Sequence, residues 1–119
     1  MKSMLIIDGS ETVAKLFAEN FERRGWIVAI CGDREGAIQR LGRSERYDAI
    51  LVDHSMPGTN GVQLVGLIRA LEQHRMTAVV MMTASTAVVD EALAAGADEV
   101  LIKPINPKAL TRTVDKHLT

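Results

Sequence analysis

The chain has 119 residues, of which 47% are hydrophobic and 24% charged, a composition typical of one globular domain. Fourteen basic and fifteen acidic side chains give a formal net charge of -1, so the sequence lacks the positive excess of proteins that bind nucleic acid directly. The single cysteine, Cys31, excludes an internal disulfide, and no apolar run approaches the ~20 residues of a membrane span, so we expect one cytoplasmic domain over residues 1–119 with no membrane contact.

Short apolar runs, which predict strands, alternate with amphipathic segments, which predict helices. In chain order we expect a strand at residues 4–7, a helix at 11–24, a strand at 26–30, a short helix after Asp33, a strand at 49–52, a helix at 61–72, a strand at 78–82, a helix at 86–95, a strand at 100–102 and a helix from 107. The chain is therefore read as five successive strand–helix units.

Polar residues mark where two of these helices begin. Asp33 is expected to cap the second helix, and Asn106, which is followed by a proline, is expected to cap the last one. Within the helices, apolar side chains at helical spacing are expected to face the core. Leu16 in the first helix and Ile38 in the second belong to this inward set.

The repeated strand–helix unit predicts a fold class. Strands that are apolar at every position are typical of a sheet covered by helices on both faces. Because crossovers between parallel strands are right-handed, the favoured architecture is a doubly wound α/β fold with a five-stranded parallel sheet. A (β/α)₈ barrel would need about twice this length.

Polar side chains stand where four of the five strands end, at Asp8, Asp53, Thr83 and Lys103. Ligands of an open parallel sheet bind at this edge. Carboxylates hold hard divalent cations such as Mg²⁺, and a carboxylate can also attack phosphorus to give an aspartyl phosphate. A hydroxyl and an ammonium can neutralise charge on a phosphoryl group in transfer. The four residues therefore predict phosphoryl chemistry assisted by a divalent cation.

Several short segments carry a resemblance to a known family, each at the end of a predicted strand or beside one. They are Ile6-Ile7-Asp8, Asp48-Ala49-Ile50-Leu51-Val52-Asp53, Met56-Pro57-Gly58-Thr59-Asn60-Gly61, Met82-Thr83-Ala84, Gly96-Ala97-Asp98-Glu99 and Lys103-Pro104. With these segments in order, the whole chain resembles a response-regulator receiver domain of the CheY-like kind. The resemblance implies a flavodoxin-like arrangement of the five strand–helix units.

The resemblance also implies a role for each polar residue. Asp53 resembles the phosphoacceptor, which receives a phosphoryl group from a histidine kinase or a phosphotransfer protein. Asp8 resembles a member of the acidic pair that holds Mg²⁺, with Asp53 and the main-chain carbonyl of Ser55 as further ligands. Thr83 resembles the switch hydroxyl, which moves to the phosphoryl group. Lys103 resembles the lysine that pairs with that group, and the bond from this lysine to the following proline is cis in typical members.

The family reads phosphorylation out as a changed protein-binding face, usually built from the fourth helix, the fifth strand and the fifth helix. The resemblance therefore implies a downstream effector protein as partner, and the same face could join two copies of the chain. The product would be a modified state of the protein, so we expect a signalling phosphoacceptor with partly self-catalysed phosphotransfer and dephosphorylation, not an enzyme. The chain is either a stand-alone receiver or part of a longer regulator.

Two residues depart from the family pattern. Gly9 stands where the family has the second residue of the acidic pair, which predicts weaker Mg²⁺ binding. Val100 stands where the family usually has Tyr or Phe, so a rotamer change of an aromatic ring cannot be the readout. Both departures favour an alternative function, a degenerate receiver that binds a partner independently of phosphate.

A third hypothesis is an enzyme or flavin protein on the same fold class. Asp8-Gly9-Ser10 is similar to phosphatases with an aspartate nucleophile, but Ser10 stands where those enzymes need a second acid. Aromatic residues make up only 3% of the chain, which leaves few rings to stack a flavin. This hypothesis therefore ranks behind the two receiver functions.

Two further polar residues lie next to the predicted site in sequence. Glu11 is explained by its place in the first turn of a helix, where the helix dipole favours an acid. His54 follows Asp53 directly, and alternation along a strand sends adjacent side chains to opposite faces. We therefore expect His54 to have a surface or packing role and not to bind the metal.

Overall fold

Five parallel strands form the central sheet, in the order β2-β1-β3-β6-β7. In the computed structural model, which describes residues 1–118, they are β1 (Ser3–Ile7), β2 (Ile27–Cys31), β3 (Ala49–Asp53), β6 (Ala78–Thr83) and β7 (Glu99–Ile102). The chain moves outward from β1 to β2 and then crosses back to β3, so the winding direction reverses between β1 and β3. The predicted doubly wound fold is confirmed, and this switch point is where such folds bind ligands.

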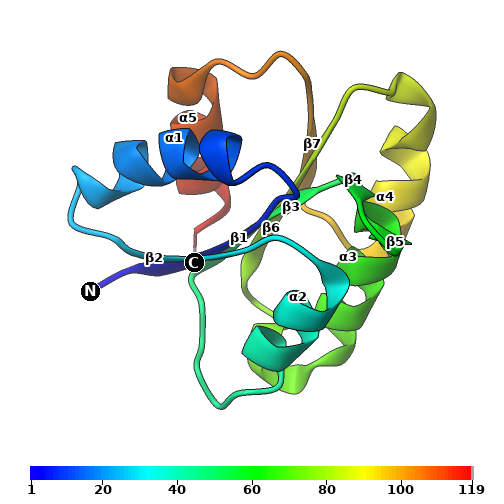
Figure 1. Ribbon diagram of the computed structural model, residues 1–119, viewed down its shortest axis with the longest axis horizontal. Helices are drawn as coiled ribbons and strands as arrows, with labels where there is room; N and C mark the ends of the chain where they lie inside the picture. The colour runs from blue at the N-terminus through cyan, green and yellow to red at the C-terminus, as the bar shows by residue number, and fades with distance from the viewer. Residues whose placement is uncertain (119) are drawn as a thin grey trace.

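Five helices cover the two faces of the sheet (Figure 1). One face carries α1 (Glu11–Glu22) and α5 (Pro107–His117), and the other carries α2 (Arg34–Leu41), α3 (Gly61–Ala70) and α4 (Val89–Ala95). Along each strand, alternate side chains point into one or the other of the two apolar layers between sheet and helices. Because both faces are covered, the strands are apolar at every position. Within residues 1–118 no helix is both long and apolar enough to cross a membrane.

Several predicted helix boundaries are confirmed at the level of hydrogen bonds. The Asp33 carboxylate accepts from the main-chain N–H of Gly36, and the side chain of Asn106 accepts from that of Lys108. At the other end of a helix, Gly96 has a φ of 119°, a left-handed conformation that ends α4. Residues at or next to these helix ends therefore determine where the helices begin or end.

Three segments have local structure that the sequence pattern did not predict. The expected helix at 86–95 begins as the 3₁₀ turn η2 (Thr86–Val88), and a second 3₁₀ turn, η1 (Glu72–His74), follows α3. The loop after β3 contains a small antiparallel hairpin, β4 (Ser55–Met56) and β5 (Thr59–Asn60). Its turn includes Gly58 with a φ of 78°, which favours glycine. This hairpin forms one wall of the site described below.

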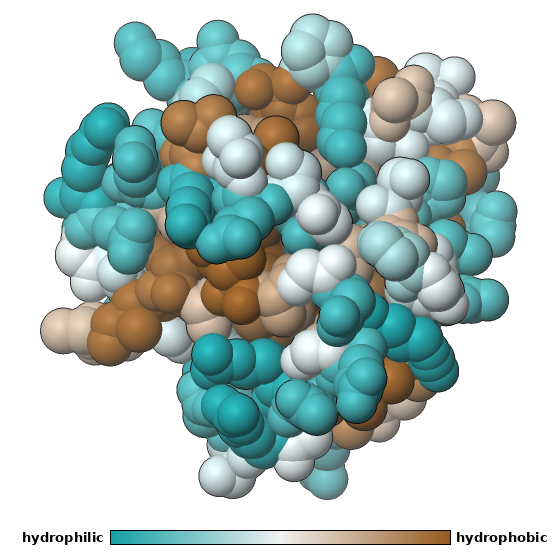
Figure 2. Space-filling view, viewed as in Figure 1, coloured by the Kyte–Doolittle hydropathy of each residue, from teal (hydrophilic) through white to brown (hydrophobic). Residues whose placement is uncertain are grey.

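The inward set of helical residues was wrong at two positions. Leu16 is 57% exposed and Ile38 is 45% exposed. The buried stripe of α1 consists of Ala14, Phe17, Ala18 and Phe21, and Leu16 lies off this stripe because adjacent helical residues point about 100° apart. Other large apolar side chains also reach the surface, where Figure 2 shows patches bordered by hydrophilic residues.

Candidate functional site

Two buried carboxylates lie side by side at the switch point of the sheet. Asp8 directly follows β1 and Asp53 ends β3, and these strands are neighbours in the sheet. Asp8 is 2% exposed and Asp53 is 5% exposed. Buried charges need partners, so the surroundings of each carboxylate decide what this site can hold.

The carboxylate of Asp8 is only half satisfied. Its Oδ1 accepts a hydrogen bond of 2.8 Å from the main-chain N–H of Ser10, while its buried Oδ2 has no partner among the described residues. Burial raises the pKa of Asp8, and the nearby Asp53 raises it further, against the lowering effects of the Ser10 N–H and Lys103. A buried oxygen without a donor beside a second carboxylate is a suitable place for a cation.

Replacing Asp8 by asparagine will stabilise the metal-free fold. Because the pKa of Asp8 is raised in the folded protein, the unfolded chain loses this proton first, and the cost of the buried charge grows as the pH rises above the ordinary value of 3.8. Asparagine keeps an oxygen for Ser10 and carries no charge. In urea titrations at pH 7 with EDTA, we expect the free energy of unfolding to rise by about 1 kcal/mol. An unchanged or lower value would contradict this explanation.

Lys103 is the cation that faces Asp53. Its Nζ lies 2.8 Å from Asp53 Oδ1, which also accepts a longer hydrogen bond of 3.3 Å from the main-chain N–H of Ser55. The lysine is positioned by the end of β7, where its own N–H donates to the Thr83 carbonyl at 2.7 Å. The bond from Lys103 to Pro104 is cis, as expected. Asp53 Oδ2 accepts no hydrogen bond from the described residues and is the freer oxygen.

Gly9 leaves space beside the Ser55 carbonyl, one of the expected metal ligands. A Cβ atom at this position would lie 3.5 Å from Pro57 Cδ and 3.8 Å from the Ser55 carbonyl oxygen, which are ordinary contact distances. Within residues 1–118, no group of three or more His, Cys, Asp and Glu side chains is placed to hold a metal ion. Mg²⁺ is commonly held by one or two carboxylates plus water, so Asp8, Asp53 and the Ser55 carbonyl form a fitting but sparse ligand set.

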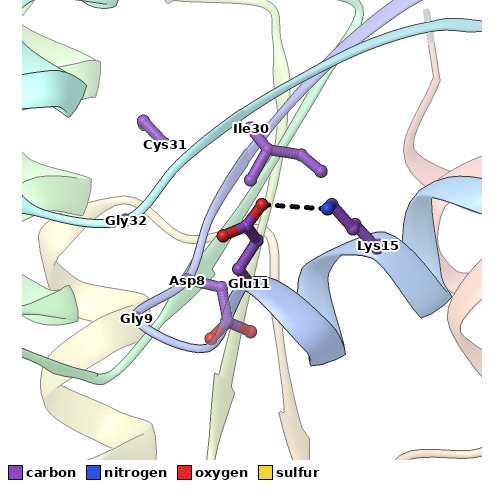
Figure 3. Close-up of a pocket in the computed structure, with 7 residues that line it drawn as sticks. All are labelled: Asp8, Gly9, Glu11, Lys15, Ile30, Cys31 and Gly32. Atoms are coloured by element: carbon purple, nitrogen blue, oxygen red, sulfur yellow. Dashed lines mark ion pairs between the residues drawn. The ribbon is translucent and has the colours of Figure 1, made fainter.

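Glu11 does not replace the missing acid. Its carboxylate forms an ion pair with Lys15, 2.9 Å away and one turn along α1, and this pair lowers the pKa of Glu11. Figure 3 shows the Glu11 carboxylate directed toward Lys15 while the Asp8 carboxylate points to the other side of the chain. The explanation of Glu11 as an acid of the first helical turn therefore agrees with the structure.

Thr83 lies at this edge of the sheet without contacting Asp53. Its buried Oγ1 accepts from the main-chain N–H of Ser85 at 3.0 Å and lies 3.3 Å from Nδ1 of His54, whereas no hydrogen bond to Asp53 is formed within residues 1–118. The sequence predicts a surface or packing role for His54 and no metal binding. It does not predict that Thr83 is the partner of His54. Only the pairing of β3 with β6 reveals it.

Val100 lies on β7, opposite Met81 of β6. It is partly buried and packs against the apolar layer under α2, α3 and α4. At this position the chain therefore contributes an aliphatic packing residue, with no ring that could turn between two orientations.

The fold and the site together define a class of protein: a doubly wound five-stranded domain with paired carboxylates and a lysine at its switch point. The family model of the response regulator receiver domain matches residues 4–115. The chain belongs to this family, the receiver domains of two-component systems.

Relatives support the assignment in sequence and in structure. The chain is 32% identical over 117 residues to the DNA-binding response regulator MtrA of Mycobacterium tuberculosis, covering 97% of this chain and 50% of that protein. The chain thus spans about half the length of the curated relatives it matches. The chemotaxis response regulator CheY4 of Vibrio cholerae superposes with a TM-score of 0.90 at 28% identity, covering 99% of both chains.

A third relative bears on the metal. The response regulator TrrA of Thermotoga maritima, solved in complex with Mg²⁺-BeF, has a TM-score of 0.86 at 27% identity and covers 99% of this chain and 100% of its own. Receiver domains bind Mg²⁺, as that structure illustrates.

Proposed function

We propose that this chain accepts a phosphoryl group on Asp53 and signals through altered protein binding. The observation that carries the proposal is the pairing of the buried Asp53 with the Lys103 ammonium at 2.8 Å, directly beside the unsatisfied carboxylate of Asp8. A structural aspartate at a strand end needs neither a lysine partner at hydrogen-bond distance nor a second buried carboxylate next to it. The arrangement suits a nucleophile whose environment is prepared for added negative charge.

The two oxygens of the Asp53 carboxylate differ in their hydrogen bonds, and this difference determines which of them attacks phosphorus. Asp53 Oδ1 is engaged by Lys103 and Ser55, so Oδ2 is the oxygen that attacks phosphorus. A new O–P bond forms while the P–N bond of a phosphohistidine breaks, and the leaving imidazole nitrogen keeps the electron pair and takes up a proton. Lys103 stands close enough to neutralise charge on the acylphosphate.

Mg²⁺ would supply further neutralisation of the phosphoryl oxygens. Asp8, Asp53 and the Ser55 carbonyl are the residues that would hold it, with Gly9 leaving one carboxylate fewer than the family pattern. We propose that binding is correspondingly weak, because affinity for a hard cation rises with the number of charged ligands.

Intact-protein mass spectrometry tests this function. After incubation with acetyl phosphate, the wild-type chain is expected to gain one phosphoryl group only when Mg²⁺ is present. Asp53→Asn is expected to gain none, whereas Asp90→Asn, a change at an exposed aspartate of α4, is expected to be labelled like the wild type. No labelling, under conditions that label an ordinary receiver, would contradict the proposal.

The sparse ligand set also supports a second function, a phosphate-independent interaction module. Gly9 removes one metal-ligating acid, and Val100 removes the usual aromatic of the switch. This alternative predicts that a partner captured by the wild-type chain binds Asp53→Asn with equal affinity. A partner that distinguishes the phosphorylated chain from the unphosphorylated one would favour the switch.

We propose a histidine kinase or phosphotransfer protein as the phosphoryl donor and an effector protein as the target, in the cytoplasm. The face of α4, β7 and α5 supports protein binding because Leu93 and Ile102 are exposed there, and it could equally join two copies of the chain. The chain would act as one receiver domain over residues 1–119 and as a signalling phosphoacceptor, not as an enzyme.

A further inference from the structure

The pairing of β3 with β6 brings His54 next to Thr83. Asp53 pairs with Met82 across the two strands. The residues that follow them, His54 and Thr83, are therefore neighbours where the strands end. Both residues therefore lie at the carboxyl edge of the sheet, where β3 and β6 end. Nδ1 of His54 lies 3.3 Å from Thr83 Oγ1.

The hydrogen-bonding capacity of the Thr83 hydroxyl indicates which group donates in this contact. Thr83 is 2% exposed, and its hydroxyl has one proton to donate. The oxygen already accepts from the Ser85 N–H at 3.0 Å, and Nδ1 of His54 is the acceptor that the structure places within reach of the proton. With Nδ1 of His54 as the acceptor, the buried hydroxyl is satisfied both as donor and as acceptor.

The main chain of His54 is held tightly where β3 ends. The His54 N–H donates to the Met82 carbonyl at 2.8 Å, and its carbonyl accepts from Gly61 at 2.9 Å. Gly61 packs so closely that a Cβ atom there would lie 2.7 Å from the His54 Cα. The backbone of His54 therefore does not shift with Thr83, and turning the Thr83 hydroxyl away from Nδ1 breaks the hydrogen bond.

We propose that His54 is a positioning residue that holds the Thr83 hydroxyl in its resting orientation and so opposes the switched state. The inference rests on the proposed function, in which Thr83 moves to the phosphoryl group on Asp53. In this role the His54 side chain acts through Thr83 and not on the phosphoryl group itself. The strength of the hydrogen bond between His54 and Thr83 determines how much of the free energy of phosphorylation is needed to release Thr83.

Two substitutions separate the hydrogen bond from the bulk of the ring. Asparagine carries an oxygen on Cγ, the same number of bonds from the backbone as Nδ1 of histidine, so His54→Asn keeps an acceptor for Thr83. His54→Leu places a methyl group there and removes the acceptor. His54→Ala repeats the loss without added bulk should the leucine variant fold poorly.

The first measurement needs no phosphorylation. Three-bond NMR couplings from the Thr83 methyl carbon to the backbone nitrogen and carbonyl carbon report the χ1 rotamer of Thr83 in the unmodified full chain. We expect one rotamer in the wild type and in His54→Asn, and averaged couplings in His54→Leu and His54→Ala. A single wild-type rotamer in the variants without an acceptor would overturn the inference, and so would averaging in His54→Asn.

The second measurement uses beryllofluoride with Mg²⁺ as a stand-in for the phosphoryl group. His54→Leu is expected to bind it about threefold tighter than the wild type, since one hydrogen bond no longer has to be broken, and His54→Asn is expected to match the wild type. Equal affinity in all three proteins would overturn the inference. If the wild type binds no beryllofluoride, the proposed phosphoacceptor function fails, and the rotamer couplings alone decide the role of His54.

Discussion

Replacing Gly9 by aspartate will tighten Mg²⁺ binding about 10- to 100-fold. The added Cβ meets no atom closer than 3.5 Å, so the side chain enters existing space without displacing the backbone. That space borders the Ser55 carbonyl oxygen, so a carboxylate there adds a third acid to a site with two. Isothermal titration of Mg²⁺ into the wild-type and variant chains measures the change directly.

Two controls separate ligation from general charge. Gly66→Asp adds the same charge to α3, at a position where a Cβ has no neighbour within 4 Å, and is expected to leave Mg²⁺ affinity near that of the wild type. Gly9→Asn adds nearly the same bulk without the charge and is expected to give a small gain. Equal tightening by the two aspartate variants would show that the site does not use the space beside Gly9.

Arg69→Ala will lower the free energy of unfolding by about 3 kcal/mol. The guanidinium of Arg69 extends from α3 and donates to the carbonyls of Thr77 and Gly96, each at 2.7 Å, and to Asp98 Oδ2 at 2.7 Å. The same Asp98 oxygen accepts from the Val79 N–H at 2.8 Å. Truncation leaves several partly buried acceptors without a donor, and urea denaturation at neutral pH measures the loss.

The matched control is an arginine that pairs at the surface. Arg24 donates to both carboxylate oxygens of Asp115 at 2.9 and 3.0 Å, but both side chains are more than two-fifths exposed. Arg24→Ala is therefore expected to cost less than about 1 kcal/mol. Arg69→Lys is expected to lose much of the stability that Arg69→Ala loses, because an ammonium cannot reach three separate segments at once. Equal effects of the two alanine variants would contradict the role assigned to Arg69.

The fold was largely predictable because burial and local polar chemistry leave a short-range record in the sequence. Continuous apolar runs marked all five strands, and Asp33 and Asn106 marked the starts of two helices through bonds to residues two or three positions away. Leu16 and Ile38 were misplaced because the rotation of a helix about its axis depends on how closely it approaches the sheet. The hairpin after β3 was missed because two-residue strands are too short to show periodicity.

The candidate site was also largely predictable from the sequence. Asp8, Asp53, Thr83 and Lys103 could be chosen from the sequence because each stands at the end of an apolar run, and parallel strands bring such ends to one edge. The sequence also determined that Gly9 supplies no carboxylate. The pairing of Glu11 with Lys15 was also within reach of the sequence, because the two residues lie four positions apart on one predicted helix.

By itself, then, the sequence determined a receiver fold and the residues that line its ligand edge. Tertiary structure alone decided which atoms of those residues are engaged: Lys103 on one oxygen of Asp53, an unsatisfied oxygen on Asp8, and His54 on the Thr83 hydroxyl. The last of these contacts joins residues 29 positions apart and follows from the register of β3 against β6. Register is set by the packing of whole strands, and a slip of one residue would send the same side chains to opposite faces.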